Sequence, residues 1–313
     1  METYSGQIAE LVACLQELTN LDSTIALLEW DQSVNMPTNH KGHQARANLS
    51  GYIAGLRHRK AISADFERLL QVAKEKVDKG LLNNNERCIV ASAFEDFERD
   101  RKLPPEFVEE QTRVAGESQQ VWEAAKEKSD FKLFEPYLNK IVALKRQEAG
   151  YLQEKGQTPY DALLDDYEPG YDTAKLEVIF KDLKDFLVPF IQKIQGSSSW
   201  VKPDIIKKPV EIGLQMKFAK MVARKIGYDI NSGGVHLSIH PFSTSFHPTD
   251  ARITTRCKRR NFVKDCLMSL VHECGHAMYE QGLLPEYFGT PMAESVSFGV
   301  HESQSRLWEN LVG

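Results

Sequence analysis

The 313 residues are 42% hydrophobic and 27% charged, a composition typical of an ordinary globular protein with a sizeable core. The net charge of −5 provides no positive field, so we expect neither nucleic acid nor a membrane surface as a partner. The chain has no apolar stretch long enough to span a bilayer, no secretory signal at its start and no paired cysteine spacing among its five cysteines. These features predict a cytoplasmic protein with buried free thiols.

Residues 1–195 are predicted to be almost wholly helical. Apolar residues recur at steps of three and four, as in amphipathic helices, and Pro104–Pro105 would open one of these helices. The clearest helical segments are 8–30, 64–82, 83–103, 105–129, 131–155 and 172–195.

The composition changes near residue 196, and 196–313 is predicted to be a second region. A turn-rich connection at 196–210 precedes one more helix at 211–227. Residues 234–256 alternate apolar and polar side chains and are interrupted by two prolines, which predicts a small sheet of two or three short strands. Helices at about 260–281 and about 291–311 are expected to follow.

The stretch "VHECGHAM" contains two histidines four residues apart, with a glutamate directly after the first. Residues i and i+4 share one face of a helix, so His272 and His276 can direct two imidazoles at one metal ion. Glu273 would then lie beside a metal-bound water as a general base. Gly275 weakens a helix, and its presence suggests the close approach of another backbone.

A catalytic zinc site usually has a third protein ligand, and two downstream residues compete for this role. Glu294 and Glu302 are both expected on the following helix, and their spacing alone does not decide between them. His301 could orient a ligand or contact the substrate, but it could equally be a surface histidine. His240 belongs to a group of histidines on the small sheet that suggests a polar cavity beside the metal helix.

Several short motifs, in this order, resemble those of the carboxypeptidase Taq family of metallocarboxypeptidases. They are "WDQSVNMP" (30–37), "HPF" (240–242), "DARIT" (250–254), "HECGH" (272–276) and "HESQ" (301–304). The resemblance covers essentially the whole chain. It implies a mainly α fold with a long cleft, similar to neurolysin and the angiotensin-converting enzymes, with residues 1–195 forming a cleft wall and the small β-sheet lying beside the metal helix.

The resemblance also implies a function and a ligand set. The metal, zinc or alternatively cobalt, would be held by His272, His276 and Glu302, with Glu273 as the base. The family is expected to release single residues from peptide C-termini and to form homodimers. Arg252 is the best candidate cation for the substrate carboxylate, because a guanidinium binds a carboxylate with two hydrogen bonds; a structural pair with Asp250 is the alternative.

The family pattern continues well beyond residue 313, so we expect the polypeptide to be truncated at its C-terminus. Three alternatives to a carboxypeptidase therefore stay open. They are an endo-acting oligopeptidase with the same metal site, a metal-binding but inactive helical protein, and a helical interaction module that carries the motif by accident.

Overall fold

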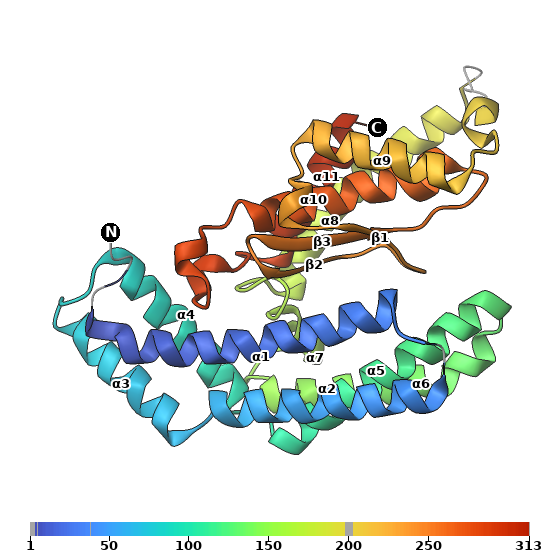
Figure 1. Cartoon of the computed structure of the whole chain (residues 1–313). Helices are drawn as coiled ribbons and strands as arrows, with labels where there is room; N and C mark the ends of the chain where they lie inside the picture. Colours follow the sequence, from blue (N-terminus) through green and yellow to red (C-terminus); the bar gives the residue numbers. More distant parts are fainter. Residues whose placement is uncertain (1–3, 5, 38, 198–202, 313) are drawn as a thin grey trace.

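A computed structural model describes residues 4, 6–37, 39–197 and 203–312, and in these residues the fold is mainly α-helical, with one small sheet (Figure 1). The turn-rich connection predicted at 196–210 lies partly outside the described residues. The helices are α1 (Ala9–Val34), α2 (His40–Ala61), α3 (Ala64–Asp78), α4 (Asn84–Asp100), α5 (Pro105–Lys128), α6 (Phe131–Leu152), α7 (Pro159–Leu164), α8 (Thr173–Gln195), α9 (Ile212–Ile226), α10 (Ser269–Gln281) and α11 (Phe298–Val312). The strands are β1 (Val235–Leu237), β2 (Ser243–His247) and β3 (Asp250–Thr255).

Three helices of the first half begin with capping residues or a proline that suit a helix start. The side chain of Ser63 accepts a hydrogen bond from the amide of Phe66 at the start of α3. Asn83 and Glu86 form a reciprocal capping box at the start of α4. Pro105 occupies the first turn of α5, where no intrahelical donor is needed. The predicted helical segments at 64–82, 83–103 and 105–129 are therefore confirmed, with slightly shorter bounds.

Helix α1 lies between two parts of the fold. In Figure 1 it runs below the sheet and above α2, α5 and α6. Its first half buries apolar side chains against α3 and α4, including Leu11, Leu15 and Leu18 of α1 with Leu70 and Ile89 opposite. Its second half contacts β2, so that α1 connects the helical layer to the sheet.

The sheet supports the helix that carries the two histidines. Its strand order is β1–β3–β2, with β1 parallel and β2 antiparallel to the central β3. Val235 and Ile253 are buried from the sheet side against Cys266, Leu270 and Cys274 from the helix side. This burial fixes α10 on the sheet, and the sheet predicted at 234–256 is confirmed.

Of the last two predicted helices, the first is present close to its expected bounds and the second begins later than expected. The helix expected from 260 starts as a π-helical turn, Val263–Met268, and becomes α10 at Ser269. The helix expected from 291 is interrupted, because Pro291–Ala293 forms only a short 3-10 turn and the next residue, Glu294, is extended. Helix α11 begins at Phe298, so the prediction that Glu294 and Glu302 share one helix is wrong.

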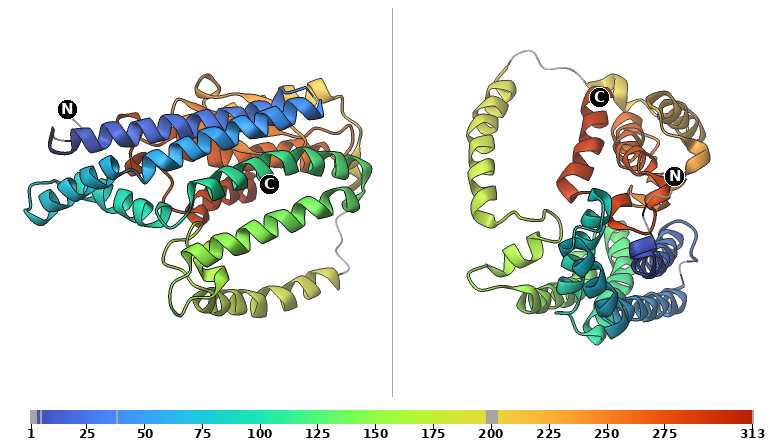
Figure 2. Two further views of the ribbon diagram at one scale, coloured as in Figure 1. Left: turned by 90° about the horizontal axis from the view of Figure 1, so that it is seen from below. Right: turned by 90° about the vertical axis from the view of Figure 1, so that its left-hand side faces the viewer.

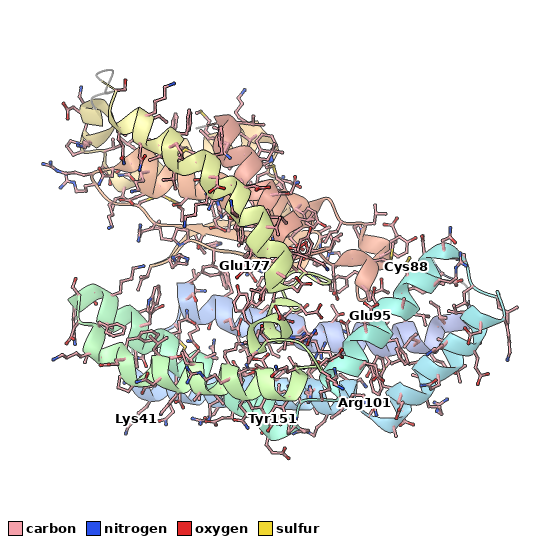
Figure 3. All side chains as sticks on the ribbon, turned by 180° about the vertical axis from the view of Figure 1, so that it is seen from behind. Lys41, Cys88, Glu95, Arg101, Tyr151 and Glu177 are labelled. Carbon is pink, nitrogen blue, oxygen red and sulfur yellow. The ribbon has the colours of Figure 1, made fainter. Side chains whose placement is uncertain are left out.

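The cysteines are only partly as predicted. All five are free thiols, and Cys266 and Cys274 are buried in the core between the sheet and α10. Cys88 is exposed on α4, as Figure 3 shows, so the expectation of buried thiols is wrong for this residue. It lies on the side of α4 opposite to Val90 and Ala93, which enter the core.

Helix α8 has no buried residue, although its sequence is strongly amphipathic. In both views of Figure 2 it stands to one side of the rest of the fold. Val178, Phe180 and Phe186 are each more than half exposed on it. Among the described helices, α8 included, none combines the length and apolar content that crossing a membrane requires.

Candidate metal centre

The two histidines of α10 point to the same side of the helix. The rings of His272 and His276 have centroids 5.0 Å apart, as the i, i+4 spacing predicts. His276 is 9% exposed, whereas His272 is half-buried and borders a cavity. The opposite side of α10, with Leu270 and Cys274, is fully buried against the sheet.

Glu302 approaches both histidines from α11. Its Oε2 lies 3.1 Å from Nε2 of His276 and 3.7 Å from Nε2 of His272. One ligand atom from each of the three residues falls within 4.8 Å of the others. Metal bonds of 2.0–2.1 Å in a tetrahedron place neighbouring ligand atoms about 3.3 Å apart, close to the 3.1 and 3.7 Å found here, so this donor set fits a divalent metal ion.

Gly275 allows α11 to come this close. A Cβ atom at this position would lie 2.5 Å from both the carbonyl oxygen of Gln304 and the Cα of Ser305. The close backbone approach predicted for Gly275 is therefore present, and its partner is the helix that carries Glu302. The contact between α10 and α11 thus brings the third donor to the histidine pair.

Glu294, the competing third ligand, lies elsewhere. Its carboxyl group faces Asp22 and Asp96 beside Arg57, in a cavity between α1, α2 and α4. The Glu294 side chain keeps contact with solvent, but partial loss of surrounding water, followed by the charges of Asp96 and Asp22, raises its pKa to about 7. Glu294 does not belong to the group of donors at His272 and His276.

Glu273 is buried next to this group and lines a cavity of about 530 Å³ together with His272. Burial, and then the negative charge of Glu302, raises the pKa of Glu273 to about 8. Partial burial opposes ionisation of Glu302 too, but a hydrogen bond from Ser305 and the neighbouring His272, His276 and Arg306 outweigh it and lower the pKa of Glu302. The pKa is thus raised for Glu273 and lowered for Glu302.

One residue near the site was not anticipated. The Oε2 of Glu309 lies 3.1 Å from Nδ1 of His272, on the ring side opposite to the candidate metal-binding nitrogen. Such carboxylate–histidine contacts orient metal ligands and set their tautomer. Glu309 follows Glu302 by seven residues, so two helical turns place both on one face of α11, and this spacing could have identified it. Nδ1 of His276 has no hydrogen-bond partner in the described part of the chain.

His301 lies directly against the donor group. Its ring stacks on that of His276 with a centroid distance of 4.5 Å, and its Nε2 is 2.9 Å from Oε1 of Glu280. The positive form of His301 acts with burial to lower the pKa of His276. Burial is the larger of these effects, and both favour the neutral imidazole that a metal ligand must be.

Arg252 and His240 are placed differently from each other. The guanidinium of Arg252 donates two hydrogen bonds to Asp250, at 2.7 and 2.8 Å, and lies near the rings of Trp30 and Phe246. This is the structural pair considered as its alternative role. His240 lies in the loop after β1 and lines the cavity that contains His272 and Glu273.

Comparison with known proteins gives a consistent result. The family model of the carboxypeptidase Taq (M32) metallopeptidases matches residues 10–313. The thermostable carboxypeptidase 1 of Thermus thermophilus is 36% identical over 323 residues, which cover 99% of this chain and 62% of that protein. The carboxypeptidase 1 of Bacillus subtilis is 30% identical over 313 residues, covering 100% of this chain and 61% of the relative.

Solved structures agree with the fold. The M32 carboxypeptidase of Deinococcus radiodurans R1 superposes with a TM-score of 0.85 at 37% identity, covering 99% of this chain and 61% of that one. The expected mainly helical fold with a small sheet is confirmed by this match. The chain spans about three fifths of the length of the relatives it matches. On its sequence and its fold, the chain belongs to the carboxypeptidase Taq (M32) family of metallopeptidases.

Proposed function

We propose that this chain contains the metal centre of a carboxypeptidase that releases single residues from peptide C-termini. The observation that supports this most directly is the grouping of His272, His276 and Glu302 within 4.8 Å, with Glu273 buried beside them at a cavity. Two nitrogen donors and one carboxylate suit Zn²⁺ best, and Co²⁺ accepts the same ligands. Residues 1–195 would form one wall of the peptide-binding cleft and 196–313 the catalytic region.

The proposed roles follow from the position of each group. When bound, a divalent metal would polarise the scissile carbonyl and lower the pKa of a water molecule. Glu273 accepts the proton of the attacking water and delivers it to the leaving amine. A nearby divalent charge favours the ionised form of Glu273, against the effect of burial, and so prepares it as a base.

Glu273→Gln provides the test of the base. We expect full metal content by elemental analysis, together with a loss of about 10²–10⁴ in peptide hydrolysis, because an amide cannot accept the proton. The exposed Glu286→Gln, a matched control outside the site, should keep both properties. Wild-type turnover by the fully loaded Glu273→Gln protein would show that the base is assigned wrongly.

The alternatives differ in their products. Mass spectrometry of a peptide ladder should detect only single C-terminal residues from a carboxypeptidase, whereas internal fragments would indicate an oligopeptidase. Stoichiometric metal without any hydrolysis would indicate an inactive metal-binding protein, and absence of metal from protein purified without chelators would indicate an accidental motif. Sedimentation at several concentrations tests the homodimer that the family likeness suggests.

A further inference from the structure

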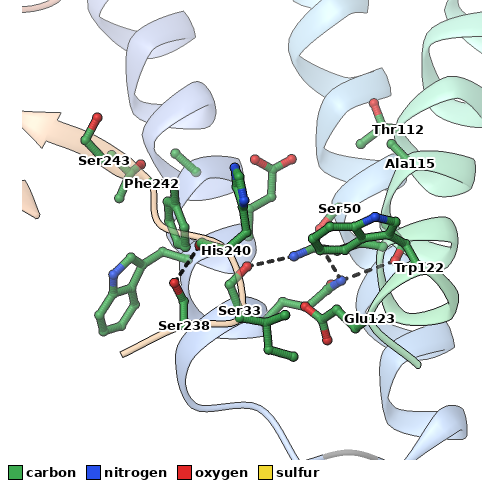
Figure 4. A pocket seen from close by; sticks show the side chains of 18 residues that line it. Ser33, Ser50, Thr112, Ala115, Trp122, Glu123, Ser238, His240, Phe242 and Ser243 are labelled. Carbon is green, nitrogen blue, oxygen red and sulfur yellow. Dashed lines mark hydrogen bonds between the residues drawn. The ribbon is translucent and has the colours of Figure 1, made fainter. Parts of the chain in front are cut away.

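A second cavity adjoins the one beside the metal centre. It has a volume of about 450 Å³ and lies between α1, α2, α5 and the loop from β1 to β2 (Figure 4). His240 lines both cavities, so the two are neighbours. In Figure 4, Trp122 and Glu123 come from α5, and His240 and Phe242 come from the loop.

The two cavities differ in charge. The cavity at the metal centre is lined by three cationic side chains, those of Arg256, Lys264 and Arg306, with Glu273 and Glu309 as its carboxylates. Arg256 pairs with Asp265, and Arg306 with Glu302 and Glu309. Within the described residues, Lys264 has no ion pair, which leaves one cation available for an anionic group at this end.

The second cavity carries the opposite charge. Its ionisable acidic side chains are Glu29 of α1 and Glu123 of α5, and neither makes an ion pair with a lysine, arginine or histidine of the described chain. Glu123 is half-buried and Glu29 is more exposed, and loss of part of the surrounding water raises the pKa of both carboxyl groups. An incoming cation would relieve this desolvation cost.

The remaining lining is suited to the stem of a long cationic side chain. The rings of Trp30, Trp122 and Phe242 provide apolar surface, and the carbonyl groups of nearby amide side chains can accept hydrogen bonds. The ammonium group of Lys126 lies 4.5 Å from the centre of the Trp122 ring, so this ring already contacts one cation of the chain, but in the described residues Lys126 forms no ion pair with Glu29 or Glu123. Burial and nearby positive charges lower the pKa of His240, so its neutral ring does not compensate the two glutamates at pH 7.

We infer that this second cavity, here named the acidic cavity, binds a lysine or arginine side chain of the peptide, one or two residues before the residue that is released. The charge difference gives the direction of the peptide. Its terminal carboxylate faces the cavity at the metal centre, where Lys264 lies unpaired among the described residues, and its upstream part enters the acidic cavity past His240. The inference rests on the proposed function, because it takes the ligand to be a peptide bound by its C-terminus.

Binding can be measured without hydrolysis. The ligands are acetylated tetrapeptides with a reduced last peptide bond, each with lysine or the uncharged norleucine at the second or third position from the C-terminus. Calorimetry on the metal-loaded protein gives the Kd of each pair. We expect the lysine peptide to bind about tenfold more tightly at one of the two positions, because two carboxylates in a partly desolvated cavity attract its charge.

The double variant Glu29→Gln/Glu123→Gln should reduce this preference to less than about threefold, since the cavity keeps its shape but loses its charge. The matched control Glu10→Gln/Glu127→Gln changes two exposed glutamates on the same helices and should keep the preference. Equal Kd values for lysine and norleucine at both positions, no measurable binding of either peptide, or a preference that survives in the cavity variant would overturn the inference.

The outcome is separate from that for the proposed function. A lysine preference without hydrolysis of ordinary peptides would contradict the carboxypeptidase and leave the acidic cavity supported. Hydrolysis with equal affinity for both peptides would do the reverse.

Discussion

Removal of the Glu309 carboxylate should weaken metal binding even though Glu309 is not a candidate ligand. Glu309→Ala deletes the acceptor 3.1 Å from Nδ1 of His272 and frees the ring to rotate or to adopt the other tautomer. Glu309→Gln keeps an acceptor oxygen and loses only the charge. The structure therefore predicts an ordered series in metal affinity, with the wild type first, then Gln, then Ala.

The size of the effect follows from the contact. A hydrogen bond to a charged group contributes about 1.5–3 kcal/mol. Glu309 also pairs with Arg306 at 2.9 Å, and its side chain is 28% exposed, so we expect its hydrogen bond to contribute an energy near the lower end of this range. About 1.4 kcal/mol corresponds to a factor of ten in Kd. We therefore expect an increase in Kd of about tenfold for Glu309→Ala and about threefold for Glu309→Gln.

The assay is competition for Zn²⁺ against a chromogenic chelator, combined with thermal unfolding of the metal-free protein. An orienting role should raise the Kd for Zn²⁺ and leave the unfolding temperature of the metal-free protein unchanged. A purely structural role should lower that unfolding temperature as well. Asn310→Ala, an exposed change on the same helix, is the control. A Kd for Glu309→Ala within twofold of the wild type would refute the orienting role.

Three further predictions concern packing, pH and association. Gly275→Ala should lower the free energy of unfolding by about 1–3 kcal/mol, because its Cβ meets the backbone of α11. Gly150→Ala, where a Cβ meets nothing, should raise the free energy of unfolding by about 0.5–1 kcal/mol. Urea unfolding measures both variants, and equal effects would contradict the close contact at Gly275. Burial, Asp96, Asp22 and Glu280 raise the pKa of Glu294 to about 7 against the opposing Arg57, so the folded state holds a proton that the unfolded state has lost. Stability should therefore fall as the pH rises from about 4.5 to 7, and Glu294→Gln should flatten this part of the pH profile by less than about 1 kcal/mol, since the side chain keeps solvent access. Phe186→Lys on the exposed face of α8 should reduce concentration-dependent association in sedimentation experiments. Asp182→Asn, which makes the same change in charge on this helix, should not reduce it. Equal association of both variants would exclude the apolar face of α8 as the cause.

Much of the fold could be predicted because the residues that start and stop its helices lie close in sequence to the groups that they contact. The polar residues that cap α3 and α4 lie within a few positions of the amides that they bind. The i, i+4 spacing of His272 and His276 is likewise a property of one helix, and so was readable from a few residues. The close approach at Gly275 could be predicted, but the identity of its partner helix could not, because Gly records only that space is needed.

The path between α10 and α11 could not be predicted, because distant residues fix it. Gly289 has a φ of 82° and approaches Gln16 of α1 so closely that a Cβ would lie 2.5 Å from the Gln16 side chain. The amide of Phe298 donates to the carbonyl of Tyr167 at 2.8 Å, more than a hundred positions away in the sequence. These contacts lie before and after the extended Glu294, and no periodicity in residues 282–298 predicts them.

The candidate metal centre and the acidic cavity depend on different parts of the chain. The candidate donors of the metal centre, the proposed base Glu273 and Glu309 all come from α10 and α11, which pack on each other through Gly275. Helix α10 in turn rests on the small sheet, so the sheet and the contact between α10 and α11 position the donors. The acidic cavity, by contrast, needs α1 and α5 of the first half as well as the loop from β1 to β2. Disruption of the contact between α1 and β2 should therefore weaken peptide binding more than it weakens metal binding.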